Sequence, residues 1–223
     1  MARTPLLYGI RLAWPVALGM LIAASVAAAQ VDPHAAHRRA LQQDHGASPT
    51  RVELPDTALR MRDGSPIRLD AQTLGDRILV VDFVFTHCTT ICPALTAIMA
   101  SVQRSLSGQE DDWLLISVTV DPARDTPARM DGFARSVHAG RDWWWLTGSP
   151  AEIDRTLRAF GIAPGRPEDH APMVLVGRPS QDRWLRWVGM PPPGQIVAAV
   201  EGMRVKSGNG TAAAGGERSN ANR

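Results

Sequence analysis

The sequence has little excess charge and almost no lysine, and these shortages argue against one class of function. Its 223 residues include 24 Lys and Arg against 22 Asp and Glu, and Lys206 is the only lysine. Arg3 and Arg11 account for the small excess, because residues 1–29 contain no acidic residue. A protein that binds the phosphate backbone needs a basic stripe, which this sequence lacks. The composition therefore excludes nucleic acid from the expected partners.

Long apolar runs are scarce as well, since residues 12–29 (LAWPVALGMLIAASVAAA) form the only one. The run follows two arginines and ends in three alanines, which is the pattern of a secretory signal peptide. A retained membrane anchor is the alternative, because the run approaches the roughly 18–20 residues that span a bilayer. We assign residues 1–29 to a signal peptide or membrane anchor. Either interpretation exports the rest of the chain to the periplasm, where it remains soluble or is anchored to the inner membrane, in an oxidising compartment.

The exported part divides into a linker, one domain and a tail. Residues 30–50 are polar and lack a sustained apolar period, which predicts a flexible linker. Residues 206–223 are rich in Gly, Ala and Asn, which predicts a disordered tail. Between them, residues 51–205 are long enough for a single domain that buries roughly 70% of its unfolded surface.

Strand and helix patterns alternate within this domain. Residues 78–85 (ILVVDFVF) and 113–120 (WLLISVTV) have the near-continuous apolar character of strands covered on both faces. A hairpin is predicted around Asp63-Gly64-Ser65. Further strands are expected at 143–146, 173–176 and 184–188, and helices at 93–106, 126–138, 149–161 and 194–205. This order predicts an α/β fold, namely a single thioredoxin-like domain with a mixed sheet flanked by helices and an N-terminal hairpin.

Cysteine is scarce as well, and the two cysteines, Cys88 and Cys92, stand four apart in THCTTICP. They lie where the first buried strand ends and a helix begins with Pro93. The positive end of the helix dipole favours an anion there, so at least one cysteine is expected to have a lowered pKa. A structural disulfide is one interpretation of the pair, although so short a loop would stabilise the fold only weakly. A redox dithiol and a soft-metal site for Cu(I), or for Cu(II) with an added imidazole, are the others.

Six histidines could supply that imidazole. His34, His37 and His45 lie in the predicted linker, where His34 and His37 would bind copper at most weakly. His87 adjoins Cys88, and the position of His138 at the end of a helix suits the dipole without any further role. The sixth, His170, precedes the strand at 173–176, whose leading loop packs against the cysteine turn in a thioredoxin-type sheet. Taken alone, it reads as an ordinary loop histidine.

Together these residues resemble the Sco/SenC family of copper-binding, thioredoxin-fold proteins that serve cytochrome c oxidase assembly. The matching pieces occur in the family's order within residues 52–203. They are Phe83-x-Phe85-Thr86-x-Cys88-x-x-x-Cys92-Pro93, Val120-Asp121-Pro122-x-x-Asp125-Thr126-Pro127, Trp145-Leu146-Thr147-Gly148 and Asp169-His170. The resemblance implies that Cys88, Cys92 and His170 are copper ligands and that a cytochrome c oxidase subunit is a partner.

Three smaller expectations concern residues near the site. Pro172 precedes a strand as a cis-proline does in thioredoxins, so we expect the Ala171–Pro172 bond to be cis; a cis bond would favour thiol–disulfide exchange. We expect Asp125 to cap a helix and leave open whether Asp121 forms a turn or supplies negative potential. We expect Trp143-Trp144-Trp145 to be buried on both faces of its strand.

Two functions remain open from the sequence, with a third well behind. The first is a copper metallochaperone that exchanges thiolate and imidazole ligands with a cuproprotein. The second is a thiol–disulfide oxidoreductase in which Cys88 attacks a partner protein and Cys92 resolves the mixed disulfide. A peroxidase is the third, because Thr86 stands two residues before Cys88 rather than the three found in peroxiredoxins.

Overall fold

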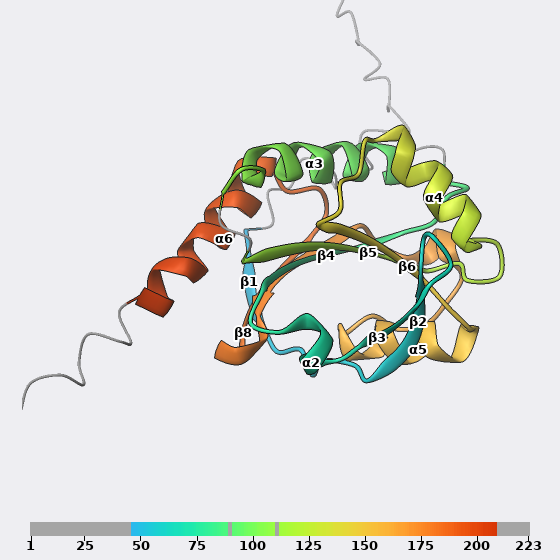
Figure 1. Ribbon diagram of the computed structural model, residues 1–223, viewed down its shortest axis with the longest axis horizontal. Coiled ribbons are helices and arrows are strands. Elements are labelled where there is room, and N and C mark those ends of the chain that lie inside the picture. Colours follow the sequence, from blue (N-terminus) through green and yellow to red (C-terminus); the bar gives the residue numbers. More distant parts are fainter. Residues whose placement is uncertain (1–45, 89–90, 110–111, 209–223) are drawn as a thin grey trace, which may run out of the picture. The chain divides into compact units, whose positions relative to one another are not determined.

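The computed structural model describes residues 46–88, 91–109 and 112–208. Eight strands form one mixed sheet in the order β1-β8-β7-β4-β5-β6-β2-β3 (Figure 1). The strands are β1 (Ser48–Thr50), β2 (Thr57–Met61), β3 (Pro66–Leu69), β4 (Ile78–Val84), β5 (Trp113–Thr119), β6 (Trp143–Thr147), β7 (Met173–Arg178) and β8 (Arg183–Val188). The helices are α2 (Ala71–Leu74), α3 (Ile91–Leu106), α4 (Pro127–Ser136), α5 (Pro150–Ala159) and α6 (Pro193–Gly208), with short 3₁₀ turns η1 (Pro167–Asp169) and η2 (Pro179–Gln181). The mixed sheet and its flanking helices confirm the predicted fold class.

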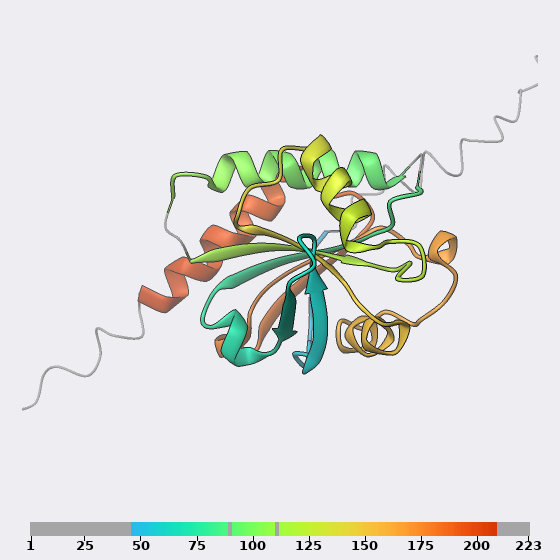
Figure 2. The ribbon, with the colours of Figure 1, turned by 45° about the vertical axis from the view of Figure 1, so that its right-hand side comes forward.

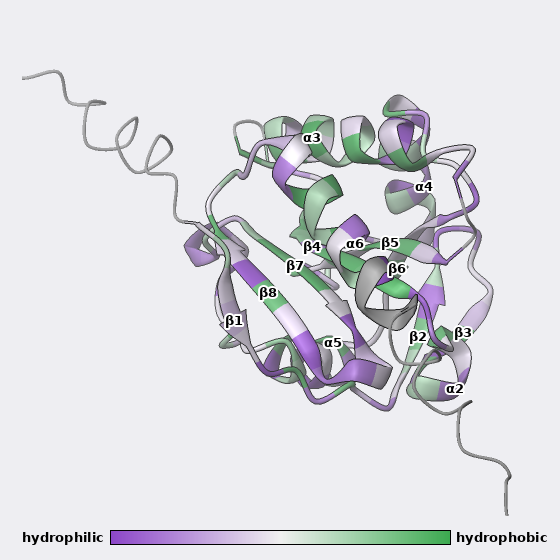
Figure 3. Ribbon diagram, turned by 90° about the vertical axis from the view of Figure 1, so that its left-hand side faces the viewer, coloured by the Kyte–Doolittle hydropathy of each residue, from purple (hydrophilic) through white to green (hydrophobic). Residues whose placement is uncertain are grey.

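The centre of the sheet is buried on both faces because β4 and β5 consist almost entirely of apolar residues. These strands pair in parallel, and every residue of both is buried. Helices α3, α4 and α6 cover one face, while α2 and α5 lie on the other (Figures 1 and 2). Hydropathy follows this arrangement, with hydrophobic residues along β4 and a mixture of polar and apolar residues along β8 (Figure 3). Side chains on successive strand residues point to opposite faces of the sheet. Each buried strand therefore contributes side chains to the hydrophobic cores on both faces.

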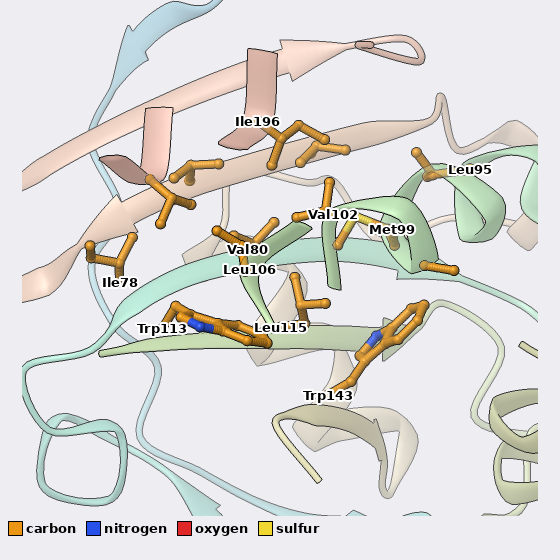
Figure 4. Close-up of a cluster of buried hydrophobic side chains, with 14 of the residues drawn as sticks. Ile78, Val80, Leu95, Met99, Val102, Leu106, Trp113, Leu115, Trp143 and Ile196 are labelled. Atoms are coloured by element: carbon orange, nitrogen blue, oxygen red, sulfur yellow. The ribbon is translucent and has the colours of Figure 1, made fainter. Parts of the chain in front are cut away.

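The core beneath α3 is built from strands β4 to β8 together with helices α3, α4 and α6. Val80 of β4, Met99 of α3 and Ile196 of α6 belong to this cluster, which also contains Trp143 (Figure 4). Trp143 and Trp145 are fully buried here, whereas Trp144 points to the other face and is only partly buried. The burial expected for this tryptophan run is therefore complete on one face and partial on the other.

Local signals set the helix starts as predicted. Thr126 and Ser149 are the N-caps of α4 and α5, and each side chain accepts a hydrogen bond from a backbone N–H of the first helical turn. A proline follows each cap, where its missing N–H has no intrahelical partner to lose. The hairpin β2–β3 also forms around the predicted turn, where Gly64 has a φ of 88°.

The structure differs from the sequence predictions in three places. Strand β1 pairs with β8, and its residues fall within the segment 30–50 that was assigned to a linker. The short helix α2 was not predicted. The Ala171–Pro172 bond is trans, because the chain already runs extended into β7 and the Pro172 carbonyl accepts a hydrogen bond from Gly189 N–H at 2.8 Å. The expectation of a cis bond was wrong, and the argument for thiol–disulfide exchange that depended on it no longer applies.

Among the described residues, no helix combines the length and apolar character needed to cross a membrane. The apolar run at 12–29 lies outside them.

Candidate metal centre

The pairing of β4 with β7 brings the cysteine turn and the histidine segment to the same edge of the sheet. These strands are antiparallel neighbours, with Asp82 opposite Val174. The carboxyl end of β4, which leads to Cys88, therefore lies beside the amino end of β7, which follows His170. Residues about 80 positions apart in the sequence meet for this reason.

Both cysteines and His170 line one cavity of about 120 Å³. The other lining residues are mostly apolar, and they come from β4, the first two turns of α3, the end of β5 and the segment before β7. They are Phe83, Phe85, Ile91, Leu95, Val120, Glu168, Ala171 and Pro172. The three residues named as ligands by the resemblance are thus neighbours in the folded chain. Within the described ranges, no group of three His, Cys, Asp or Glu side chains is already arranged to hold a metal ion.

The two thiols occupy different environments at the start of α3. The two cysteines are not joined in a disulfide; Cys88 is half-buried, whereas Cys92 is only 6% exposed. Cys92 N–H donates a hydrogen bond to Cys88 Sγ at 3.2 Å. The sulfur that receives the N–H group of the helix start is therefore that of Cys88, and this contact favours negative charge there.

Cys92 does not have the lowered pKa that a position near a helix start favours. Burial raises the pKa of its thiol to about 12, and the hydrogen bond with Cys88 and the charges of Cys88 and Asp82 add to this rise. A backbone hydrogen bond with Phe85 opposes it. Desolvation outweighs the helix dipole here because the thiol is almost completely removed from water. Of the two cysteines, Cys88 is the one placed to react first.

His170 is the third of these residues at the cavity. It follows η1 directly, and its Nε2 atom is buried without a hydrogen-bond partner among the described residues. Leaving a buried polar atom unpaired costs about 1–3 kcal/mol, so such atoms call for an explanation. An imidazole nitrogen without a hydrogen-bond partner among the described residues, at a cavity that two thiols also line, matches the donor set of a soft-metal site.

His34, His37 and His45 lie outside the described residues. Of the other histidines in the described part of the chain, neither His87 nor His138 lines this cavity. Instead, the Nη2 atom of Arg129 lies 2.6 Å from His87 Nε2. Arginine can only donate, so this histidine nitrogen accepts.

Asp125 holds the turn before Cys88, a role that the sequence analysis missed. Its buried carboxylate accepts hydrogen bonds from Thr86 Oγ1 and Thr119 Oγ1, each at 2.6 Å, and from Thr86 N–H at 3.2 Å. The helix that follows is capped by Thr126, so the capping role expected for Asp125 was wrong. Nearby, Asp121 forms a turn: its backbone carbonyl accepts hydrogen bonds from the N–H groups of Arg124 and Asp125, and its carboxylate pairs with the Arg124 side chain.

Asp125→Asn should loosen the cysteine turn. An amide offers one acceptor oxygen in place of two, so a buried threonine hydroxyl loses its partner. We expect the free energy of unfolding to fall by about 1–3 kcal/mol and Cys88 to react faster with iodoacetamide. Urea unfolding and alkylation kinetics measure the two effects, with Asp63→Asn, in the exposed hairpin turn, as the matched control. Unchanged stability and an unchanged alkylation rate would show that Asp125 does not position the turn.

Comparisons with known proteins agree with this geometry. The SCO1/SenC family model matches residues 59–175, just over half of the chain. The SCO1 protein homolog of Bacillus subtilis is 34% identical over 123 residues, which cover 54% of this chain and 63% of that protein. A putative copper-binding protein of Stutzerimonas stutzeri is 30% identical over 115 residues, covering 51% and 54% of the two chains. The matched region thus spans less than two thirds of these curated relatives.

Solved structures show the same fold. That of BsSco, described as a member of the Sco family of cytochrome c oxidase assembly proteins, has a TM-score of 0.61 at 28% identity and covers 71% of this chain and 96% of its own. Copper-bound ScoI of Arabidopsis thaliana has a TM-score of 0.55 at 20% identity, and the match covers 71% of this chain and 98% of that chain. At that identity the second likeness supports the thioredoxin-like fold alone. By its matched sequence and its fold, this chain belongs to the SCO1/SenC family.

Proposed function

We propose that this chain is an exported copper metallochaperone that delivers copper to a cuproprotein, with a cytochrome c oxidase subunit as the expected recipient. The observation that carries the proposal is the buried Nε2 of His170, which has no hydrogen-bond partner among the described residues and lies at the cavity that both cysteines line. A simple thiol–disulfide exchange protein has no need of that nitrogen. The export signal expected at residues 1–29 would place the domain in the periplasm or at the inner membrane.

The three side chains divide the chemistry between them. Two thiolates select the soft ion Cu(I), and the imidazole nitrogen extends the site to Cu(II). Cys88, which is more exposed, is the ligand at which a partner's donor atom begins to replace the protein's own. Cys92 is buried and keeps the ion attached until the exchange is complete. Copper is therefore cargo, and the disulfide form of the pair is the empty state.

Thiol–disulfide exchange is the alternative function. The pairing of a half-buried Cys88 with a buried Cys92 resembles an attacking and a resolving thiol. Copper delivery explains the same asymmetry and also gives His170 a role, so it is preferred. Reduction of insulin by the reduced protein, measured beside copper binding, separates the two functions.

His170→Ala should remove tight Cu(II) binding and leave weakened Cu(I) binding. Changes that only disturb the orientation of a metal ligand cost about 10- to 100-fold in affinity, so loss of the ligand itself should lower Cu(II) affinity by at least about 100-fold. Competition titrations of the reduced protein with Cu(I) and Cu(II) measure this. His138→Asn is the matched control, because it removes a histidine outside the cavity and suits the positive φ of 56° at that position.

Two results would contradict the proposal. One is the absence of one-to-one copper binding by the reduced wild-type protein, above all if it reduces insulin rapidly. The other is an unchanged Cu(II) affinity in a folded His170→Ala protein.

A further inference from the structure

One acidic residue lies at the cavity that Cys88, Cys92 and His170 line. Glu168 belongs to η1, two residues before His170, and it lines the same cavity of about 120 Å³. The remaining lining residues are Phe, Ile, Leu, Val, Ala and Pro, whose side chains have no donor atom for a metal ion. Within the described part of the chain, Glu168 is therefore the one further lining residue whose side chain has a donor atom.

The two neighbouring acids of η1 are held differently. Arg166 donates two hydrogen bonds to Asp169, from Nε to Oδ2 and from Nη2 to Oδ1, each at 2.9 Å. Glu168 makes only a loose ion pair with the same arginine, since 3.9 Å separates Arg166 Nη1 from Glu168 Oε1. Water screens this contact because the two side chains are 72% and 58% exposed. The Asp169 carboxylate is thus fixed by Arg166, whereas that of Glu168 is left mobile beside the cavity.

The backbone brings Glu168 and His170 to the cavity from one short turn. Pro167 begins η1, and its carbonyl accepts a hydrogen bond from His170 N–H at 3.3 Å. Glu168 lies inside the turn that this bond closes. The Nε2 atom of His170 is buried, whereas the Glu168 side chain is more than half exposed. The turn therefore offers an inner nitrogen donor and an outer oxygen donor.

The two oxidation states of copper require different donor sets. The cysteines and His170 together supply three donor atoms. Cu(II) favours a tetragonal arrangement and readily takes nitrogen and oxygen donors, so a fourth donor completes its coordination. Cu(I) has a filled d shell, which imposes no geometry, and soft thiolates satisfy it. A carboxylate at the rim is therefore useful to Cu(II) and of little use to Cu(I).

The balance of charge favours the same ion. Two thiolates outweigh the charge of Cu(I) by one unit, so an added carboxylate would leave two excess negative charges at the site. The same two thiolates only balance the charge of Cu(II), and the carboxylate then adds a single excess charge. Repulsion between like charges is stronger in a cavity shielded from water. Glu168 should therefore bind Cu(II) and stay away from Cu(I).

We propose that Glu168 is the fourth donor to Cu(II) at this site, an inference that rests on the proposed copper function. A carboxylate oxygen of Glu168 gives an electron pair to Cu(II) beside the two sulfurs and His170 Nε2, in the place that a water molecule would otherwise take. The contact with Arg166 is exchanged for a copper–oxygen bond, and no electron is transferred. With Cu(I), the carboxylate remains in solvent beside Arg166.

Glu168→Gln tests the proposal because it removes the charge and keeps the shape of the side chain. Competition titrations should show Cu(II) affinity lowered by about 10- to 100-fold and Cu(I) affinity unchanged or slightly raised. Asp169→Asn is the matched control, since it removes the same charge from the next residue, which does not line the cavity. Its Cu(II) affinity should stay close to that of the wild type. An equal loss in both variants would mean that the charge of the turn acts from a distance, and it would overturn the role of Glu168 as a donor.

The unmodified protein gives a second test, which needs no folded variant. A directly bound water molecule broadens the electron paramagnetic resonance lines of Cu(II) in water enriched in oxygen-17, because that nucleus has a spin. We expect the lines of the wild type to stay narrow and those of Glu168→Gln to broaden, since water fills the vacated position. Clear broadening in the wild type would show that water is the fourth donor and would overturn the proposal.

The outcomes separate this proposal from the proposed function. Equal Cu(II) affinity in the wild type and Glu168→Gln, with one copper ion bound to each, would overturn the role of Glu168 and leave the metallochaperone assignment intact. Binding of Cu(I) but not of Cu(II) by the wild type would do the same. Failure of the wild type to bind either ion would instead overturn the metallochaperone assignment.

Discussion

Replacing either Cys88 or Cys92 by serine is expected to lower Cu(I) affinity by about 1,000-fold or more, which corresponds to roughly 4 kcal/mol. A serine hydroxyl is a hard donor that stays protonated at neutral pH, whereas Cu(I) prefers thiolate. Neither sulfur can replace the other, because the cavity contains one thiol from the turn and one from the helix. Competition with a Cu(I) chelator such as bathocuproine disulfonate measures the loss.

The matched control for these variants is Ile91→Val. Ile91 lines the same cavity but has no donor atom, so its affinity for copper should stay close to that of the wild type. Copper affinity within tenfold of wild type in a folded Cys88→Ser or Cys92→Ser protein would mean that the cysteine concerned is not a ligand.

The largest expected loss of stability comes from Gly177→Ala. A Cβ atom at this position of β7 would lie 2.0 Å from Trp184 Cδ2, and the ring is buried with 2% exposure. Trp184 also makes an edge contact with Phe160, so it has little room to move. Overpacking a core commonly costs about 1–3 kcal/mol, and so severe an overlap should cost about 3 kcal/mol or more. Urea unfolding monitored by tryptophan fluorescence measures the change.

Gly132→Ala is the control for this substitution. Gly132 lies within α4 and would place its new Cβ in open space, so alanine should stabilise the helix by about 0.5–1 kcal/mol. A Gly177→Ala protein as stable as the wild type would show that the Trp184 ring can move aside. Such a result would contradict the tight packing of β7 against β8.

The sequence predicted the parts of the fold that depend on local pattern. The apolar runs at β4 and β5 and the Thr126-Pro127 and Ser149-Pro150 starts appear as expected. Their signals are strong because burial on both faces and helix capping leave clear marks on composition. Strand β1 and helix α2, with three and four residues, are too short to show a period, and only tertiary pairing defines them.

The site was predictable only in part. The spacing of Cys88 and Cys92 was enough to identify them as candidate site residues. The choice of His170 depended on the family resemblance, because its proximity to the cysteines arises from the pairing of β4 with β7. Asp125 could have been inferred from two adjacent parallel strands, since it follows β5 and Thr86 follows β4. The raised pKa of Cys92 follows from burial, which the helix-start pattern does not reveal.

A structure of the protein crystallised with copper, located by anomalous scattering at the copper edge, tests the account most directly. We expect one ion in the cavity, bound by the sulfur atoms of Cys88 and Cys92 and by Nε2 of His170. Copper bound elsewhere, or bound by the two sulfurs while the imidazole of His170 stays buried and apart from it, would contradict the three-ligand site on which the proposed function depends.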